Sequence, residues 1–129
     1  MTDEEIRAYF LNKPAAWLDF PFGDDVCVFK VKAKMFATLG WEQDAARINL
    51  KCDPEEAVML RDVFDAVKPG YHMNKTHWNT VIIDGSLPAG EIRRMIDNSY
   101  ALVAKSLRRA ERTALEVKFG KPALYGAAQ

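Results

Sequence analysis

Side chains able to take part in binding or catalysis are concentrated in one stretch of the sequence, residues 69–80. It holds the only two histidines of the chain, His72 and His77, together with Tyr71, Asn74, Lys75 and Trp78. Imidazoles bind metals or transfer protons, flat rings stack on nucleic-acid bases, and a lysine neutralises phosphate. The composition of this stretch therefore admits several kinds of chemistry, which the neighbouring residues have to separate.

The two histidines lack the companions that a metal site or a general base needs. No third metal ligand stands close to His72 and His77 in the sequence. An imidazole base also needs an orienting carboxylate and a nucleophile, and nothing places Asp84, the nearest downstream acid, beside either ring. We therefore expect no catalytic residue, no metal and no cofactor, and we expect both imidazoles to hydrogen-bond the loop that carries them.

A second group of candidate residues is basic and lies on two predicted strands. The group consists of Lys30, Lys32 and Lys34 on one hairpin and of Arg47 and Lys51 on the following strand. Because side chains alternate along a strand, Lys30 and Lys32 are expected to share a face. Such a cluster can neutralise several phosphates of a nucleic acid. The solvated face of an exposed sheet carries the same residue types, so both interpretations stay open.

The overall charge of the chain argues against strong nonspecific attraction to nucleic acid. The 129 residues include 18 basic and 18 acidic side chains, so the formal net charge is zero. The first 25 residues carry six acids against two bases, whereas residues 105–121 carry six bases against two acids. The length suits one domain, residues 1–129, in which the segment after about residue 112 is expected to be loose because its apolar pattern decays.

The first half of the chain predicts a helix followed by a meander of strands. Thr2 and Glu5 form a capping-box pattern, and Pro14 is expected to end this helix near residues 11–13. Residues 16–22 are apolar and contain proline, which indicates a loop or a short edge strand. Alternating apolar residues predict strands over 27–32, 35–41 and 47–52, separated by turns at 33–34 and 42–44.

The second half predicts two helices around one more strand. Asp53 and Pro54 form a strong helix start, and apolar residues at helical spacing extend that helix through Val67 to Pro69. Residues 78–83 are β-branched and aromatic and predict a strand. An apolar stripe from Ile92 to Ala110 predicts the last long helix. The fold class is thus α+β, a mostly antiparallel sheet with helices packed on one face.

The cysteines and the N-terminus indicate the compartment. Cys27 and Cys52 lie in alternating apolar runs and are expected to be reduced and buried. No apolar run approaches the ~20 residues that span a bilayer, and the acidic N-terminus lacks the plan of a signal peptide. We therefore expect a cytoplasmic protein without a membrane partner, and the sequence leaves its oligomeric state open.

Several segments together resemble one protein family. They are residues 21–26, 29–31, 34–37, 49–54, 69–81 and 99–103. These segments are similar to the MmcQ/YjbR-like proteins, and the run from Tyr71 to Trp78 is the most specific of them. Ala33 stands where a glycine is expected, and the tail after Arg112 lies outside the match. The resemblance implies an α+β fold similar to the frataxin-like, double-wing proteins and a role in binding DNA.

Three functions are compatible with these observations. The first is a DNA-binding protein that contacts double-stranded DNA with the basic hairpin, with Arg47 and Lys51, and with the stretch from Tyr71 to Trp78. The second is a protein-interaction or small-ligand module in which that aromatic stretch forms a recognition pocket. The third is a metal-binding protein or an enzyme. The short acidic run at Asp3 favours helix capping over iron binding, because the helix dipole accommodates carboxylates there.

Overall fold

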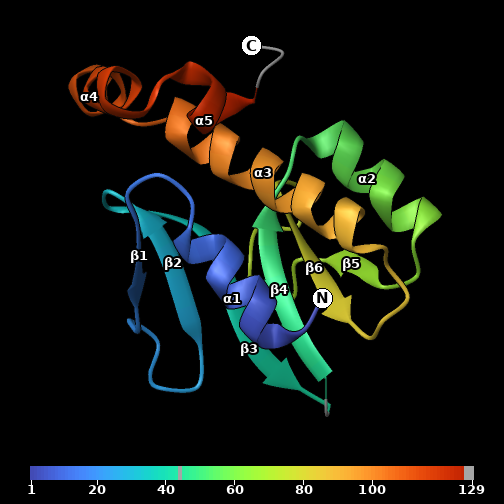
Figure 1. Cartoon of the computed structure of the whole chain (residues 1–129). Helices are drawn as coiled ribbons and strands as arrows, with labels where there is room; N and C mark the ends of the chain where they lie inside the picture. The colour runs from blue at the N-terminus through green and yellow to red at the C-terminus, as the bar shows by residue number, and fades with distance from the viewer. Residues whose placement is uncertain (44, 127–129) are drawn as a thin grey trace.

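The computed structural model describes residues 1–43 and 45–126, and within them six strands form one antiparallel sheet (Figure 1). The strands are β1 (Ala16–Asp19), β2 (Cys27–Val31), β3 (Lys34–Glu42), β4 (Ala45–Lys51), β5 (Val67–Pro69) and β6 (Trp78–Ile83). Their order across the sheet is β1-β2-β3-β4-β6-β5. The predicted meander of residues 27–52 is confirmed, and residues 16–19 are the edge strand that the sequence allowed. Asp44 of the predicted turn at 42–44 lies outside the described residues.

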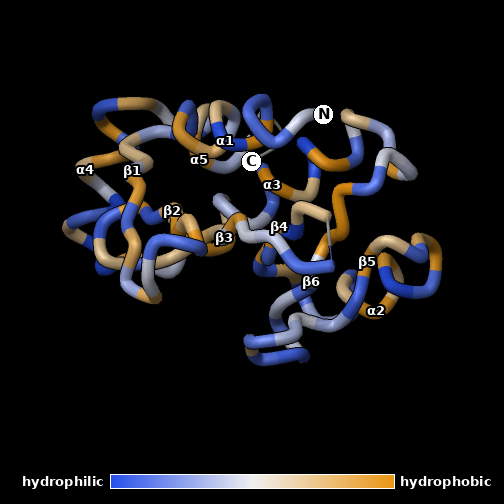
Figure 2. Tube along the Cα trace, turned by 90° about the horizontal axis from the view of Figure 1, so that it is seen from below, coloured by the Kyte–Doolittle hydropathy of each residue, from blue (hydrophilic) through white to orange (hydrophobic). Residues whose placement is uncertain are grey.

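Five helices accompany the sheet in the described part of the chain. They are α1 (Asp3–Leu11), α2 (Pro54–Val63), α3 (Ala89–Lys105), α4 (Arg109–Phe119) and α5 (Lys121–Tyr125). Helices α1 and α3 lie across one face of the sheet, and Figure 2 shows α1, α3 and α5 on one side of the central strands. The α+β fold class predicted from the sequence is therefore confirmed.

The main core lies between the sheet and the helices α1 and α3. The ring centroid of Phe10 on α1 lies 4.6 Å from that of Phe29, and Phe36 meets Tyr100 of α3 edge-on at 5.1 Å. The pairing of β2 with β3 shifts after Phe29, which leaves Phe36 as an extra residue in a β-bulge. The Ser99 hydroxyl donates to the Phe36 carbonyl oxygen at 2.6 Å, so the bulge is tied to α3.

The predicted helix boundaries hold at residues 2–11 and fail after residue 63. Thr2 and Glu5 make the full capping box. Helix α2 ends at Val63, whereas the apolar spacing predicted a helix that continued through Val67 to Pro69. Residues 67–69 form the edge strand β5, because pairing with β6 buries Val67 opposite Val81. An edge strand also tolerates a proline, which has no N–H to donate.

The C-terminal segment also differs from the prediction. The predicted long helix ends at Lys105, and Ala110 belongs to α4. The expectation of a loose tail after about residue 112 is not met up to residue 126, since α4 and α5 bury Leu115 and Leu124 in the core. Residues 127–129 lie outside the described part of the chain.

Both cysteines are free thiols. Cys52 is buried immediately after β4, and its burial raises the pKa of the thiol to about 11. Cys27 lies on β2 and is only half-buried, so the prediction of burial is met in full at one thiol and in part at the other. None of the helices in the described residues has the length and hydropathy needed to cross a bilayer.

Candidate functional site

Side-chain alternation gives the sheet two faces of different character. Leu39, Ile48 and Val81 are cross-strand neighbours on β3, β4 and β6, and all three are buried in the core beneath the helices. The opposite, helix-free face presents a polar row on the same three strands. Its members are Thr38, Asn49 and Thr80, and each pairs with the next in register.

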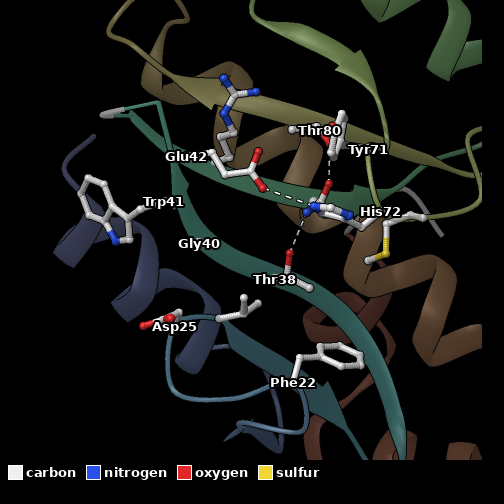
Figure 3. A pocket seen from close by; sticks show the side chains of 13 residues that line it. Phe22, Asp25, Thr38, Gly40, Trp41, Glu42, Tyr71, His72 and Thr80 are labelled. Atoms are coloured by element: carbon white, nitrogen blue, oxygen red, sulfur yellow. Dashed lines mark hydrogen bonds and ion pairs between the residues drawn. The ribbon is translucent and has the colours of Figure 1, made fainter.

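This helix-free face carries a cavity of about 390 Å³ (Figure 3). Its floor is the polar row with Gly40 and Arg47, and its walls come from two loops. The β1–β2 loop (residues 20–26) contributes Phe22, Asp25 and Val26, the β5–β6 loop (residues 70–77) contributes Tyr71, His72 and Met73, and the end of β3 contributes Trp41 and Glu42. Figure 3 shows Phe22 and Tyr71 on opposite sides of the cavity.

The polar row of the floor is a chain of hydrogen bonds that runs in one direction. The Tyr71 backbone N–H donates to the Thr80 hydroxyl at 3.2 Å, and that hydroxyl donates to Oδ1 of Asn49 at 2.5 Å. Nδ2 of Asn49 then donates to Oγ1 of Thr38 at 2.9 Å. The chain thus fixes the β5–β6 loop to the sheet at one end and finishes at the Thr38 hydroxyl under the cavity.

The β5–β6 loop is shaped by a close contact at its first residue. A Cβ atom on Gly70 would lie 2.9 Å from the carbonyl oxygen of Trp78 and 3.0 Å from its Cβ, so the backbone approach requires a glycine. The Gly70 N–H donates to the Trp78 carbonyl at 2.9 Å. Gly70 is not among the positive-φ glycines, so close approach, and not a left-handed conformation, is the reason for glycine at this position.

Helix α2 holds the far side of the same loop. Nη1 of Arg61 donates to the Lys75 carbonyl at 3.0 Å and to Oδ1 of Asn79 at 3.1 Å. Inside the loop, Oδ1 of Asn74 accepts the backbone N–H groups of Thr76 at 2.9 Å and His77 at 3.3 Å. Asn74 therefore acts as a turn former, and the loop is held at both sides.

The loop meets β3 across the mouth of the cavity. Nε2 of His72 lies 3.3 Å from Oε1 of Glu42, and the Tyr71 and His72 rings meet edge-on at 4.6 Å. The Tyr71 side chain is 68% exposed, so one flat ring surface stands open beside the cavity. This arrangement can bind a ligand with a flat apolar body and polar groups directed at the floor.

The lysines predicted on the hairpin lie on different sides of the sheet. Lys30 is on the helix-free face, where its Nζ pairs with Oδ2 of Asp19 at 2.7 Å, and this hydrogen bond lowers the pKa of Asp19. Lys34 reaches the helix side and donates to the Ser106 carbonyl at 2.8 Å. Lys32 lies in the turn with a φ of 54°, so it does not share a strand face with Lys30 as the alternation predicted.

The other predicted residues divide between the cavity and its surroundings. Arg47 lines the cavity, whereas Lys51 is half-buried on the same face of β4, opposite Trp78. Trp78 is half-buried at the start of β6, His77 is exposed, and Lys75 donates to the Tyr71 carbonyl at 3.3 Å. Tyr71, His72 and Arg47 are thus the predicted site residues that the fold brings together around one cavity.

Several residues of the cavity were missed from the sequence. They include Phe22, Thr38, Gly40, Glu42, Asn49 and Thr80. Small or polar residues at alternate positions of two predicted strands were a usable signal, because such residues leave room on one face. Their meeting depends on the strand order that places β4 between β3 and β6, and no local pattern specifies that order.

Comparisons with known proteins agree with the fold. The sequence model of the YjbR family matches residues 11–102. The chain is 34% identical over 115 residues to YjbR of Escherichia coli K12, covering 89% of this chain and 98% of that protein. It is 32% identical over 108 residues to YbdF of Escherichia coli O157:H7, covering 84% of this chain and 88% of that one.

Solved structures of related sequence are similar to this fold. A crystal structure of Deinococcus radiodurans protein DR2400, with family-model domain DUF419, matches with a TM-score of 0.82 and 39% identity, covering 88% of this chain and 87% of that one. A crystal structure from Pseudomonas syringae matches with a TM-score of 0.69 and 33% identity, covering 79% and 98% of the two chains. Sequence and structure therefore agree that this chain belongs to the YjbR family.

Proposed function

We propose that this protein is a small-ligand-binding module whose ligand occupies the cavity on the helix-free face of the sheet. The observation that carries the proposal is the cavity itself, about 390 Å³ in volume, with aromatic side chains on two facing loops and polar groups on its floor. Small-molecule sites have volumes of roughly 300–1,000 Å³ and combine apolar walls with a few polar groups. The hydrogen bonds of the floor and of Arg61 keep the cavity formed without a ligand.

Gly40 supplies the space above the floor. A Cβ atom there would meet the Asp25 carbonyl oxygen and Cγ2 of Val26 at 3.9 Å, which is ordinary contact. A small side chain is therefore tolerated, whereas a leucine would project into the volume that a ligand needs. A Cβ atom on Gly90 of α3 would meet nothing within 4 Å, so Gly90→Leu is a control that adds the same volume elsewhere.

The test is an NMR titration of the isotope-labelled protein with a panel of small aromatic fragments, both charged and neutral. We expect the backbone amides of Thr38, Gly40 and Tyr71 to shift in the wild type and in Gly90→Leu. Gly40→Leu should bind the same fragments at least about tenfold more weakly, since its side chain fills the site. No shift with any fragment, or equal binding by folded Gly40→Leu, would refute the proposal.

Duplex DNA is a second candidate, favoured by a separate observation. Arg47, Lys51 and Lys68 occupy positions on the helix-free face of β4 and β5, in register with β6. Basic side chains on adjacent strands can neutralise successive phosphates, as the double-wing interpretation of the sequence requires. Lys30 and Lys34 contribute less to this candidate, because one is paired with Asp19 and the other bonds to the α3 end.

A fluorescence-anisotropy titration at two salt concentrations tests the DNA candidate. We expect a Lys51→Ala/Lys68→Ala variant to bind duplexes of any sequence more weakly, because phosphate contacts carry no sequence information. Each lost contact should make the slope of log affinity against log salt shallower by about 0.9. Lys34→Ala is the matched control on the other side of the sheet. Absence of wild-type binding at low salt would remove this candidate.

A further inference from the structure

We propose that two copies of this chain associate through the edge strand β1, so that their two sheets form one continuous sheet across a twofold axis. The inference is independent of the proposed ligand-binding function, because it concerns an edge of the sheet and not the cavity. It rests on the backbone of β1, on the exposed apolar side chains beside this strand, and on the charges at its two ends.

The two edges of the sheet differ in how well they are protected. At one edge, β5 has only three residues, Pro69 has no N–H to donate, and α2 packs against the strand. At the other edge, β1 pairs with β2, and no second strand of the described residues pairs with its outer side (Figure 1). An edge strand presents a row of backbone N–H and C=O groups that can pair with another chain, and β1 has neither a proline nor a lysine to prevent it.

Trp17 on β1 is an exposed side chain that is already held in place. It is 43% exposed, although its Nε1 donates to the Lys32 carbonyl at 2.9 Å and Nζ of Lys30 lies 5.2 Å from its ring centroid. A side chain that is fixed before association loses little conformational entropy, and tryptophan is among the residues that dominate interface energies. Trp17 is therefore a preorganised anchor for a partner that lies along β1.

The helix side of this edge is apolar as well. Phe20, which directly follows β1, is 42% exposed, and Leu11 at the end of α1 is 41% exposed. Tyr9 donates to Asp97 of α3, and Leu11 lies two residues further, about 200° around the helix. Leu11 is thus on the side of α1 turned away from α3 and toward β1, against which α1 packs. A partner at this edge buries apolar side chains on both faces of the sheet, which compensates for the few backbone hydrogen bonds of a short strand.

The charges at the two ends of β1 favour a second copy in the antiparallel orientation. Lys32 is exposed beside the start of β1, and Asp24 and Asp25 are exposed in the loop after its end. Antiparallel pairing of β1 with the same strand of a second copy brings the basic end of each strand to the acidic end of the other. Parallel pairing would place like charges together. A twofold axis generates the antiparallel arrangement and closes the assembly at two chains.

Sedimentation velocity of the full chain over a concentration series tests the proposal. We expect the weight-average mass to rise from that of one chain toward that of two chains between about 1 μM and 1 mM. Amide spectra of the isotope-labelled protein over the same series locate the contact. The backbone amides of residues 16–19 should shift with concentration, whereas those of Val67 and Lys68 on the opposite edge should not.

Two variants and one control assign the contact to β1. Trp17→Ala should weaken the dimer at least about tenfold, because it removes the anchor. Phe20→Lys places a charge beside the edge and should weaken the dimer as well, which keeps the test open if Trp17→Ala does not fold. Met59→Ala is the matched control, since it removes an apolar side chain that is 62% exposed on α2, beside the opposite edge. It should dimerise like the wild type.

Each contrary outcome has a definite meaning. The mass of a single chain throughout the series would refute the association. If the mass doubles while the shifts gather on β5 and α2, or while Met59→Ala dissociates and Trp17→Ala does not, the assignment to β1 is wrong. A mass that rises beyond two chains would contradict the closed twofold arrangement. None of these results bears on the binding of fragments in the cavity, so the proposed function is tested separately.

Discussion

Oε1 of Glu42, at the end of β3, lies 3.3 Å from Nε2 of His72 in the β5–β6 loop. The two side chains are 47% and 68% exposed, so the contact stands in water at the mouth of the cavity. An exposed pair of this kind contributes only about 0–1 kcal/mol to stability. Its effect is therefore expected on the position of the loop and not on the stability of the fold.

Glu42→Gln tests that role. The free energy of unfolding should change by less than about 0.5 kcal/mol, since the pair is exposed. The backbone amides of residues 71–73 should become more mobile, because the loop loses its contact with β3 on this side. Heteronuclear NOE values measure that mobility, and Glu55→Gln on α2 removes the same charge away from the cavity. Unchanged values in Glu42→Gln would show that the backbone bonds alone position the loop.

Gly70→Ala should destabilise the protein. The added Cβ would lie 2.9 Å from the Trp78 carbonyl oxygen, which is backbone and cannot rotate away. Overpacking of this kind costs about 1–3 kcal/mol. Gly90→Ala on α3 is the opposite control, because it has open space and should stabilise the helix by about 0.5–1 kcal/mol. Urea denaturation of both variants checks the two signs, and a neutral Gly70→Ala would mean that β5 and β6 separate easily.

The polar row of the cavity floor should behave as a coupled unit. Asn49→Ala removes the acceptor of the Thr80 hydroxyl and the donor to Thr38, so we expect a loss of about 1–3 kcal/mol. In Asn49→Ala the Thr80 hydroxyl is left without its acceptor, and Thr80→Val removes that hydroxyl. The double variant should therefore lose less stability than the sum of the two single variants. Additive losses in a denaturation cycle would indicate that water replaces the missing partner.

Sequence patterns predicted the helices and strands correctly where the interacting residues lie close together in the sequence. The capping box of Thr2 and Glu5, the Asp53 N-cap and the alternation in β4 all depend on residues a few positions apart. One failure came at Val67, whose helical spacing from Leu60 suggested a longer α2. Pairing across the sheet with Val81 buries this side chain, so tertiary contacts and not the local apolar spacing decided its conformation.

The candidate site was predictable on one side only. The β5–β6 loop could be found because Tyr71 and His72 stand out by residue type. The floor could not, since Thr38, Asn49 and Thr80 come from three strands that meet through register and strand order. Arg47 was predicted as one of the basic residues that contact DNA phosphates, and the structure places it in the lining of the cavity.

The two cysteines should differ in reactivity, and the pH dependence of Cys52 should be unusual. Burial raises the pKa of the Cys52 thiol from 9.0 to about 11, whereas the half-buried Cys27 lies on β2. In a Cys27→Ser variant, the alkylation rate of Cys52 by iodoacetamide should keep rising with pH up to about 11, since only the thiolate reacts. Alkylation of the native wild type should modify Cys27 first.

The raised pKa of Cys52 also determines how the stability of the protein changes with pH. The folded-state pKa lies above the unfolded value, so the unfolded chain loses its thiol proton first, and the contribution of the neutral Cys52 thiol is lost as pH rises from about 9 to about 11. Cys52→Ala should remove this part of the alkaline decline in urea denaturation, with the Cys27→Ser variant as the reference. The alkylation experiment has its own contrary outcome. If the rate at which iodoacetamide modifies Cys52 levels off near pH 9 in the folded Cys27→Ser variant, water reaches Cys52 in the native state.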